Sequence, residues 1–463
     1  MSHSTDRVIA ANRFGFGARP TELAQIGNDA RGALHAQLEH ACPQPMGDLP
    51  TAESLIASVS RYREELQQAK RDDSASQVSV GMKLVELYRP AYEKHAIARF
   101  RLAVESDRSF VERLVHFWSN HFAVSIDKIA VLGLAGPLET EAIRPNVFGN
   151  FRDLLSAVER HPAMLVYLDN HISAGPNSPA AQFVARRGLD RKVGLNENLG
   201  REILELHTLG VDGGYTQQDV TTLAAIITGW SVGGGVGALR GGEPGRFLFR
   251  ENLHEPGEKN LLGRRYAEAG VGQGEKALAD LALHPRTAHH LATKLARHFV
   301  ADEPPAALVD RLARAYLKHD GDLPALYRVL IDDPLTWQSA PGKFKSPSDY
   351  IHSTYRALAL PVRDERRALA PFELLGQRNF QPGSPAGWPD RSADWDGPSA
   401  LLKRIEWATA VGQRVGMQAD AMDVLTDSLG DAVSDRTREA VGRAPDRAQA
   451  LTLALASPEM MRR

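Results

Sequence analysis

The sequence predicts a mainly α-helical protein: a single large multi-helix domain with a small β-hairpin insertion. Apolar residues recur at three- and four-residue spacing in one segment after another, as they do on the buried face of a helix. The stretch 231–265 breaks this pattern, with glycines around short β-type runs. No linker and no internal repeat forces a division, so residues 1–463 are expected to form one domain.

The helical spacing identifies the expected elements in chain order. They are 20–41, 80–104, 109–124, 153–169, 196–207, 217–230, 274–300, 304–332 and 398–415. In the stretch 231–265, "RFLFR" and the later "KNLLG" predict one small hairpin. The polar region 60–85 is expected to be a helix end followed by an exposed connection. "NFQPGSPAGWPDRSADWDG", about 380–397, has no periodicity, and its prolines and tryptophans favour an irregular functional loop that packs on the core.

The bulk composition excludes several classes of protein. With 463 residues, a net charge of −2 and 24% charged residues, the chain lacks the basic surface that binding to nucleic acid requires. No window reaches the roughly 18 to 20 apolar residues of a membrane span, and the first residues do not resemble a secretory signal. As written, the chain is expected to be cytoplasmic. One cysteine, Cys42, cannot form an internal disulfide or a thiolate metal cage, so a metal would need histidine and carboxylate ligands.

The segment "NENLGREILELHTLG" carries a narrow polar stripe on an otherwise apolar helix. At about 100° per residue, Asn198, Arg201, Glu202 and Glu205 fall on one side. Two glutamates at this spacing can share a cation or a proton, whereas Arg201 could neutralise them in a structural ion-pair network. We expect the stripe to face inward, with Glu202 or Glu205 bonded to a basic or imidazole group. His207 falls near the apolar flank and is expected to be a core residue.

Several motifs together resemble one family. "ANRFGFGARPTELAQI", "FWSNHFAVS", "NENLGREILELHTLG", "GYTQQDV", "HPRTAHHLATKLARHFV", "KSPSDYI" and "SPAGWP" occur in the order seen in the bacterial DUF1800 family, a domain of unknown function. The resemblance covers nearly the whole chain and implies a fold and site positions, but no reaction. It also implies a sulfatase-like exported partner, because many relatives resemble exported proteins that accompany one; export with such a partner is therefore an alternative to a cytoplasmic location.

Further candidate site residues lie in other family-type motifs. "HFWSNHF" places Trp118 and His121 three residues apart on one helix face with Asn120 beside them, so His121 is a candidate catalytic group and Asn120 a binding group. His254 lies in a loop beside the hairpin, where it either binds a ligand or caps a turn. Lys294 lies on an apolar helix and either pairs with an acidic group or reaches solvent.

Two classes of function remain open from the sequence. Trp118, Trp230 and Trp388 all lie in family-type motifs, and tryptophans gathered around His121 and the glutamates would suit an oxidoreductase with a metal or a tryptophan-derived protein cofactor. Alternatively, the three indoles are separate packing anchors and the chain is a non-catalytic partner or assembly factor. We expect the loop 380–397 to pack over the same region as the glutamate stripe.

Overall fold

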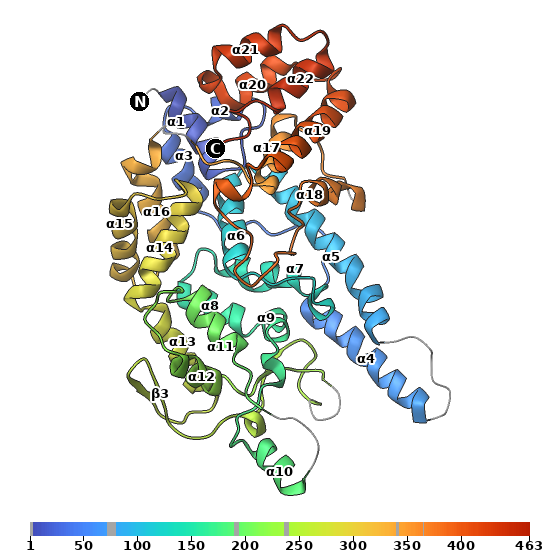
Figure 1. Ribbon diagram of the computed structural model, residues 1–463, viewed down its shortest axis with the longest axis vertical. Coiled ribbons are helices and arrows are strands. Elements are labelled where there is room, and N and C mark those ends of the chain that lie inside the picture. Colours follow the sequence, from blue (N-terminus) through green and yellow to red (C-terminus); the bar gives the residue numbers. More distant parts are fainter. Residues whose placement is uncertain (1–2, 72–79, 189–193, 236–239, 339–341, 364) are drawn as a thin grey trace.

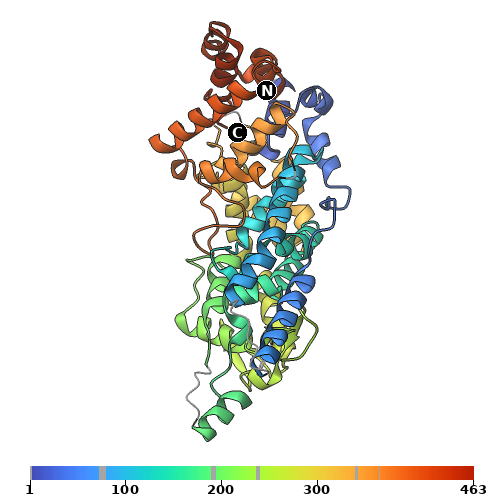
Figure 2. The same cartoon turned by 90° about the vertical axis from the view of Figure 1, so that its right-hand side faces the viewer.

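The computed structural model describes residues 3–71, 80–188, 194–235, 240–338, 342–363 and 365–463 (Figure 1). The molecule is elongated in both views (Figures 1 and 2). The C-terminal helices and the first helices share one end, and the small strands lie toward the other. The chain is mainly helical with short antiparallel strands, which confirms the predicted fold class.

The helices of the N-terminal half are α1 (His3–Ile9), α2 (Glu22–Ile26), α3 (Ala30–Gln37), α4 (Ala52–Arg71), α5 (Val80–Glu105), α6 (Ser109–His121), α7 (Ala135–Pro137), α8 (Phe151–Glu159), α9 (Pro162–Tyr167), α10 (Pro179–Arg187), α11 (Asn198–Glu202) and α12 (Gln217–Ile226). Those of the C-terminal half are α13 (Val271–Ala282), α14 (Pro285–Phe299), α15 (Ala306–Lys318), α16 (Leu323–Asp332), α17 (Pro347–Ala357), α18 (Ala370–Leu374), α19 (Pro398–Val415), α20 (Ala421–Leu429), α21 (Asp435–Gly442) and α22 (Arg447–Leu455). Part of the expected connection near residue 75 lies outside the described residues.

The stretch 231–265 forms two small ribbons where the sequence predicted one hairpin. Strand β1 (Trp230–Val232) pairs antiparallel with β2 (Phe247–Phe249), and β3 (Lys259–Leu261) pairs with β4 (Arg264–Tyr266). The β-type runs were therefore located correctly, but their pairing was wrong. The β3–β4 turn consists of Leu262 and Gly263, both with positive φ, and this two-residue turn folds β4 directly back on β3.

Helices α6 and α14 position the candidate site. In Figure 1, α6 runs through the middle of the molecule and α14 lies along its side. Most side chains of α6 are buried, including Phe110, Leu114 and Trp118. Helix α14 is amphipathic: its apolar face is buried, while Lys294 and His298 are only partly buried. The side chain of His284 caps the start of α14 by accepting from the backbone N–H of Arg286.

The hydrophobic core has one large cluster and two smaller ones. The large cluster joins the first helices to α16 and includes Phe14, Trp118 and Trp337. The second lies among α19 to α22, and the third joins α5 to α17 and α19. Among the described residues, no helix is both long and apolar enough to cross a membrane.

Candidate functional site

A pocket of about 260 Å³ lies between α6, α14 and the irregular segment 386–394. Its walls are Phe117, Asn120 and His121 from α6, Lys294, Arg297 and His298 from α14, and Ala386, Trp388, Pro389, Asp390, Arg391 and Asp394 from the segment. We refer to it as the α6–α14 pocket. It combines apolar surface with groups that exchange protons or carry charge, which is the usual composition of a small-molecule site.

One wall of the α6–α14 pocket is fixed to α6 by a paired amide contact. The Asn120 side chain donates from Nδ2 to the Trp388 carbonyl oxygen at 2.9 Å and accepts from the Trp388 N–H at Oδ1 at 2.7 Å. The preceding residue, Gly387, has φ +83°, and a Cβ there would lie 2.4 Å from the Asn120 carbonyl oxygen. Only glycine allows this close approach, so the motif "SPAGWP" holds the segment against α6.

His121 forms the inner end of the pocket as a neutral imidazole. Its Nε2 lies 3.2 Å from the His207 carbonyl oxygen, and because a carbonyl only accepts, Nε2 carries the proton. Its Nδ1 is buried and has no hydrogen-bond partner among the described residues. Burial, with the nearby charge of Lys294, lowers the pKa of His121 well below its usual value. His121 therefore carries an unprotonated, buried Nδ1 and is itself one of the residues that line the pocket.

His298 and Asp390 form an imidazole–carboxylate pair in the pocket wall. Asp390 Oδ2 lies 3.2 Å from His298 Nδ1. Burial lowers the pKa of His298 to about 4, although Asp390 opposes the shift, so the ring is neutral near pH 7. An ionised carboxylate can only accept, which places the proton on Nδ1 and leaves the lone pair on Nε2. That Nε2 is buried and makes no hydrogen bond within the described part of the chain.

Lys294 brings a positive charge to the same wall. Burial lowers its pKa to about 8, while Asp390 opposes the change, so the ammonium form still predominates at pH 7. Across the described residues, Lys294 makes no hydrogen bond and no ion pair, and its charge helps to lower the pKa of both His121 and His290. A cation that is partly buried without a close counter-ion is an unusual arrangement. Lys294 therefore gives the pocket a positive charge at pH 7.

Two more imidazoles lie behind His121. The ring of His207 is 6.1 Å away and that of His290 is 6.2 Å away, between ring centres. Buried His207 contacts Glu159 at 2.7 Å between Nδ1 and Oε1, and His290 Nε2 donates to the Leu206 carbonyl oxygen at 3.1 Å. Each of these rings is therefore held by an oxygen acceptor on one side, which fixes its orientation.

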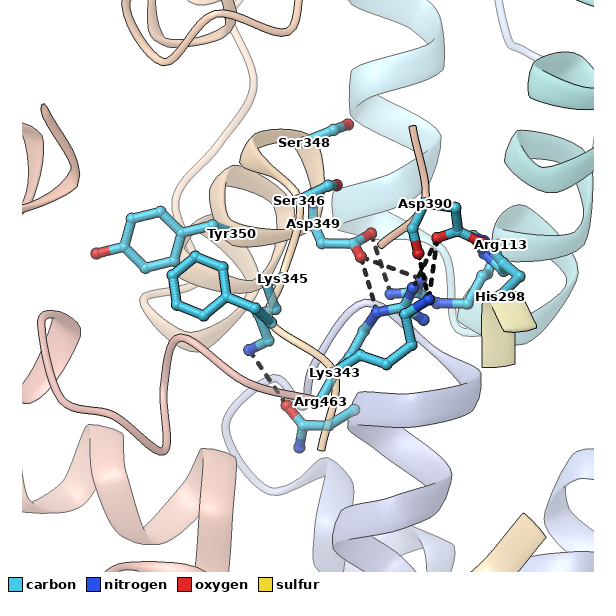
Figure 3. Close-up of polar contacts among 12 residues, drawn as sticks. Arg113, His298, Lys343, Lys345, Ser346, Ser348, Asp349, Tyr350, Asp390 and Arg463 are labelled. Atoms are coloured by element: carbon cyan, nitrogen blue, oxygen red, sulfur yellow. Dashed lines mark hydrogen bonds and ion pairs between the residues drawn. The ribbon is translucent and has the colours of Figure 1, made fainter. Parts of the chain in front are cut away.

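A charged cluster surrounds the Asp390 carboxylate (Figure 3). It consists of Arg113, Lys343, Asp349, Asp390 and Arg463. Lys343 Nζ lies 3.4 Å from Asp390 Oδ1, and Arg463 lies 3.0 Å from Asp349 and 3.7 Å from Asp390. Burial alone would raise the pKa of Asp390, but His298, Lys343 and Arg463 lower it. Asp390 is therefore ionised and held in place.

The family motif "KSPSDYI" has its structural explanation in this cluster. Ser346 caps α17 by accepting from the Asp349 N–H, which directs Asp349 toward Arg113. Lys345 is buried, and burial lowers its pKa to about 7. This motif positions the charged cluster and does not line the α6–α14 pocket.

Five of the residues selected from the sequence come together at the pocket. They are Trp118, Asn120, His121, Lys294 and Trp388. The Trp118 ring lies edge-on to His121 at 5.3 Å and donates from Nε1 to the Tyr327 hydroxyl at 2.6 Å. Of these five, Asn120, His121, Lys294 and Trp388 line the pocket, and Trp118 reaches it only through its contact with His121.

The glutamate stripe does not contribute to the pocket, and its expected partners were wrong. Arg201 bonds to Glu197 and Gln217, Glu205 accepts from the Tyr215 hydroxyl at 3.3 Å, and Glu202 has no hydrogen bond or ion pair to any described residue. The physical reason is that α11 ends at Glu202 and continues as a π-helix, Ile203–His207. Because a π-helix turns less per residue, the side-chain directions shift after residue 202.

The remaining candidates also lie outside the pocket. Asn198 is exposed at the start of α11. Trp230 packs in β1 against Phe247, with ring centres 5.5 Å apart, so the expected gathering of three tryptophans is wrong for this one. His254 is buried and bonds to the Thr228 carbonyl oxygen at 3.0 Å, which matches the turn-capping alternative.

The loop 380–397 does not pack over the glutamate stripe as expected. Its hydrogen bonds within the described chain go elsewhere: Gln381 bonds to Asp127, Trp388 to Asn120 and the Ser392 N–H to Asp302. It therefore covers α6 and α14. Proline-rich composition predicted an ordered loop, but not the surface that it would cover.

The sequence places His290, Lys294 and His298 at a spacing that could line a polar channel, but His298 was not selected as a site residue, and Asp390 and Glu159 were missed. His298 was visible one helical turn after Lys294, at the spacing that places two side chains on one face. Asp390 followed Trp388 in the irregular loop, where no periodicity indicates direction. Glu159 and His207 are far apart in the sequence, so their contact depends on tertiary packing. His207 is fully buried, as expected of a core residue.

Several side chains in and around the pocket are of kinds that can bind a metal ion. Over the described ranges, no group of three His, Cys, Asp or Glu side chains is placed to hold a metal ion. Although His121, His207 and His290 are neighbours, their arrangement does not meet this condition.

Comparison with known proteins identifies the family. The model of the family described as "Protein of unknown function (DUF1800)" matches residues 9–462. The chain belongs to the DUF1800 family. Searches of curated proteins and of solved structures found no match. The family description assigns no reaction, so the function has to be inferred from the pocket.

Proposed function

We propose that this DUF1800 protein is an enzyme that carries out acid–base chemistry on a small anionic substrate in the α6–α14 pocket. The observation that carries the proposal is that His298 and Lys294 line one pocket, and that neither the buried His298 Nε2 nor the Lys294 ammonium has a protein partner among the described residues. A base and a counter-charge for an anion are two of the groups that such a reaction needs.

His298 is the proposed general base. Asp390 holds the Nδ1 proton, which keeps Nε2 free to accept a proton and stabilises the imidazolium that results. The described lining contains no serine, threonine or cysteine, so the proton would come from the substrate or from an attacking water. Lys294 would bind a carboxylate or phosphate group of the substrate, and His121 would provide a second proton-accepting nitrogen.

The experiment is a turnover screen in D2O followed by proton NMR. Purified protein is incubated with a panel of oxoacids, hydroxyacids, carboxylate esters and phosphate esters. Exchange of C–H for C–D reports proton abstraction, and new product signals report hydrolysis. We expect turnover of at least one anionic compound, a loss of about 100-fold or more in His298→Gln, and a raised KM in Lys294→Met. Equal turnover by His298→Gln would contradict the proposal; Arg286→Gln, an exposed change on α14, serves as the control.

A second candidate, the oxidoreductase expected from the sequence, is favoured by the surroundings of Trp118. Its indole lies against His121 and donates to the Tyr327 hydroxyl, which in turn donates to the Val147 carbonyl oxygen at 3.0 Å. Oxidation of an indole releases a proton, and these neighbours offer an acceptor beside the ring. A tryptophan-derived cofactor would change the intact mass and add absorbance above 300 nm, and both changes would disappear in Trp118→Phe. An unmodified mass would exclude this cofactor.

The competing alternative is a non-catalytic partner of a sulfatase-like exported protein. It predicts no turnover in the screen and unchanged assembly with such a partner in His298→Gln. The enzyme proposal instead predicts turnover by the wild type and its loss in His298→Gln, because it requires His298 for turnover.

A further inference from the structure

A second and larger pocket lies between α5, the segment 366–381 and residues 126–132. Its volume is about 730 Å³, which is within the range of small-molecule sites, and we refer to it as the α5 groove. Its lining is Val85, Arg89, Tyr92, Glu93, Ile126, Ile129, Leu132, Arg366, Arg367, Leu369, Ala370, Phe372, Glu373, Arg378, Asn379 and Gln381. It has no lining residue in common with the α6–α14 pocket.

The interior of the α5 groove is apolar. Leu132 and Phe372 are buried, whereas Ile129 is 48% exposed although it lines the groove. Ile126 and Leu369 complete this surface and are partly buried. Leu132 and Phe372 form the closed floor of the hollow, while Ile129, Ile126 and Leu369 still expose apolar area. An alkyl chain or an aromatic ring that covers these three side chains would remove that area from water.

The rim of the α5 groove carries an excess of positive charge. Arg366 pairs with Glu93 at 3.3 Å and Arg378 pairs with Glu373, so these four charges balance. Arg89 and Arg367 have no hydrogen bond and no ion pair to any residue that the structure describes. Two guanidinium groups therefore remain available, and guanidinium binds carboxylate and phosphate oxygens through paired N–H donors.

Tyr92 adds a neutral donor within the same arginine field. It is partly buried and makes no hydrogen bond to another described side chain or backbone group. Burial raises the pKa of Tyr92, so its hydroxyl keeps its proton near pH 7. A protonated hydroxyl next to guanidinium groups would donate to the oxygen of a bound anion.

We propose that the α5 groove binds a small soluble amphiphilic anion, with an alkyl or aryl group on the Ile129–Phe372 surface and a carboxylate or phosphate at Arg89 and Arg367. Charge complementarity selects this ligand: a neutral apolar molecule leaves the arginines unused, and a small anion such as acetate leaves the apolar surface exposed. The site is independent of the proposed reaction in the α6–α14 pocket.

Calorimetric titration of the full chain with octanoate tests the proposal. We expect octanoate to bind, 1-octanol to bind at least tenfold more weakly and acetate to give no measurable binding. The double variant Arg89→Gln/Arg367→Gln should weaken octanoate binding at least tenfold. Lys94→Gln removes an exposed charge from α5 outside the groove and should leave affinity unchanged.

Several results would overturn the proposal that the α5 groove binds an amphiphilic anion. No binding of octanoate, equal binding of 1-octanol, or the same affinity in the double arginine variant would each overturn the proposal. Lys294→Met controls for the other pocket: octanoate binding that disappears in this variant belongs to the α6–α14 pocket and also overturns it. Retention on vesicles of anionic phospholipid without octanoate binding would show a lipid surface as the ligand instead.

Discussion

Replacing Lys294 by methionine is expected to stabilise the protein while removing its anion site. Burial lowers the pKa of Lys294 to about 8 from its usual value of 10.5. Each pKa unit corresponds to about 1.4 kcal/mol, so keeping this amine protonated in the folded state costs roughly 3 kcal/mol at pH 7. Methionine has similar length and no charge, and because Lys294 keeps some contact with solvent, we expect a gain of about 1 to 3 kcal/mol.

The pH dependence of the stability difference between wild type and Lys294→Met tests whether the charge of Lys294 causes that difference. The folded pKa is lowered, so between about pH 8 and 10.5 the unfolded chain holds more protons at this residue than the folded chain. The Lys294 contribution to wild-type stability therefore rises with pH in that window, and the advantage of Lys294→Met should be full below pH 8 and mostly lost near pH 10.5. Below pH 8 both states are protonated, so the difference is constant.

Urea unfolding of wild type, Lys294→Met and the exposed control Lys94→Met at pH 7 and pH 10 measures these differences. Addition of inorganic phosphate at pH 7 should stabilise the wild type and leave Lys294→Met unchanged, since a ligand stabilises only the state that binds it. If Lys294→Met is no more stable than wild type at pH 7, burial of the Lys294 charge does not destabilise the folded protein. The same conclusion follows if the difference in unfolding free energy between the two proteins is not smaller at pH 10 than at pH 7.

Three further predictions concern the pocket walls. Asn120→Ala removes both contacts to the Trp388 backbone and should cost about 1 to 3 kcal/mol and speed hydrogen exchange in 380–397, whereas unchanged exchange there would show that the contacts do not hold the loop. Glu159→Leu leaves buried His207 without its acceptor and should lower the unfolding free energy by about 1 to 3 kcal/mol; a neutral result would show that the pair is dispensable. Because burial lowers the pKa of His298 to about 4, its contribution to stability should be lost as the pH falls from about 6.5 to 4, and a stability–pH curve of the same slope for His298→Gln would contradict this.

Sequence patterns located the elements better than the contacts between them. The spacing of apolar residues in 109–124 predicted α6, because burial of one helix face depends on local order alone. The same spacing in 274–300 predicted one continuous helical element, but the structure divides it into α13 and α14, and α14 begins at Pro285 with His284 as its N-cap. The glutamate stripe failed because a uniform α-helix was assumed through Glu202, where the chain changes to a π-helix. The strand runs were recognised, but pairing of Trp230–Val232 with Phe247–Phe249 spans a glycine-rich connection whose path the sequence does not specify.

In the candidate site, too, local spacing predicted some neighbours, whereas other contacts depend on tertiary packing. Trp118, Asn120 and His121 share one helix, so their proximity followed from spacing. His298 with Asp390, and His207 with Glu159, each join segments that are distant in sequence, and only tertiary packing brings these side chains into contact.

The most direct test of the proposed active site is the protonation state of His298, measured by nitrogen-15 NMR of imidazole-labelled protein during titration with a carboxylate such as citrate. If His298 is the general base, its ring is neutral at pH 7, with the proton on Nδ1 facing Asp390 and a lone pair on Nε2. Its Nε2 signal then shifts when the anion binds. His298→Gln identifies the signal, and Lys294→Met should abolish the shift. A ring already protonated at pH 7, a proton on Nε2, or an Nε2 signal in wild type that does not shift when the anion is added would contradict this role of His298.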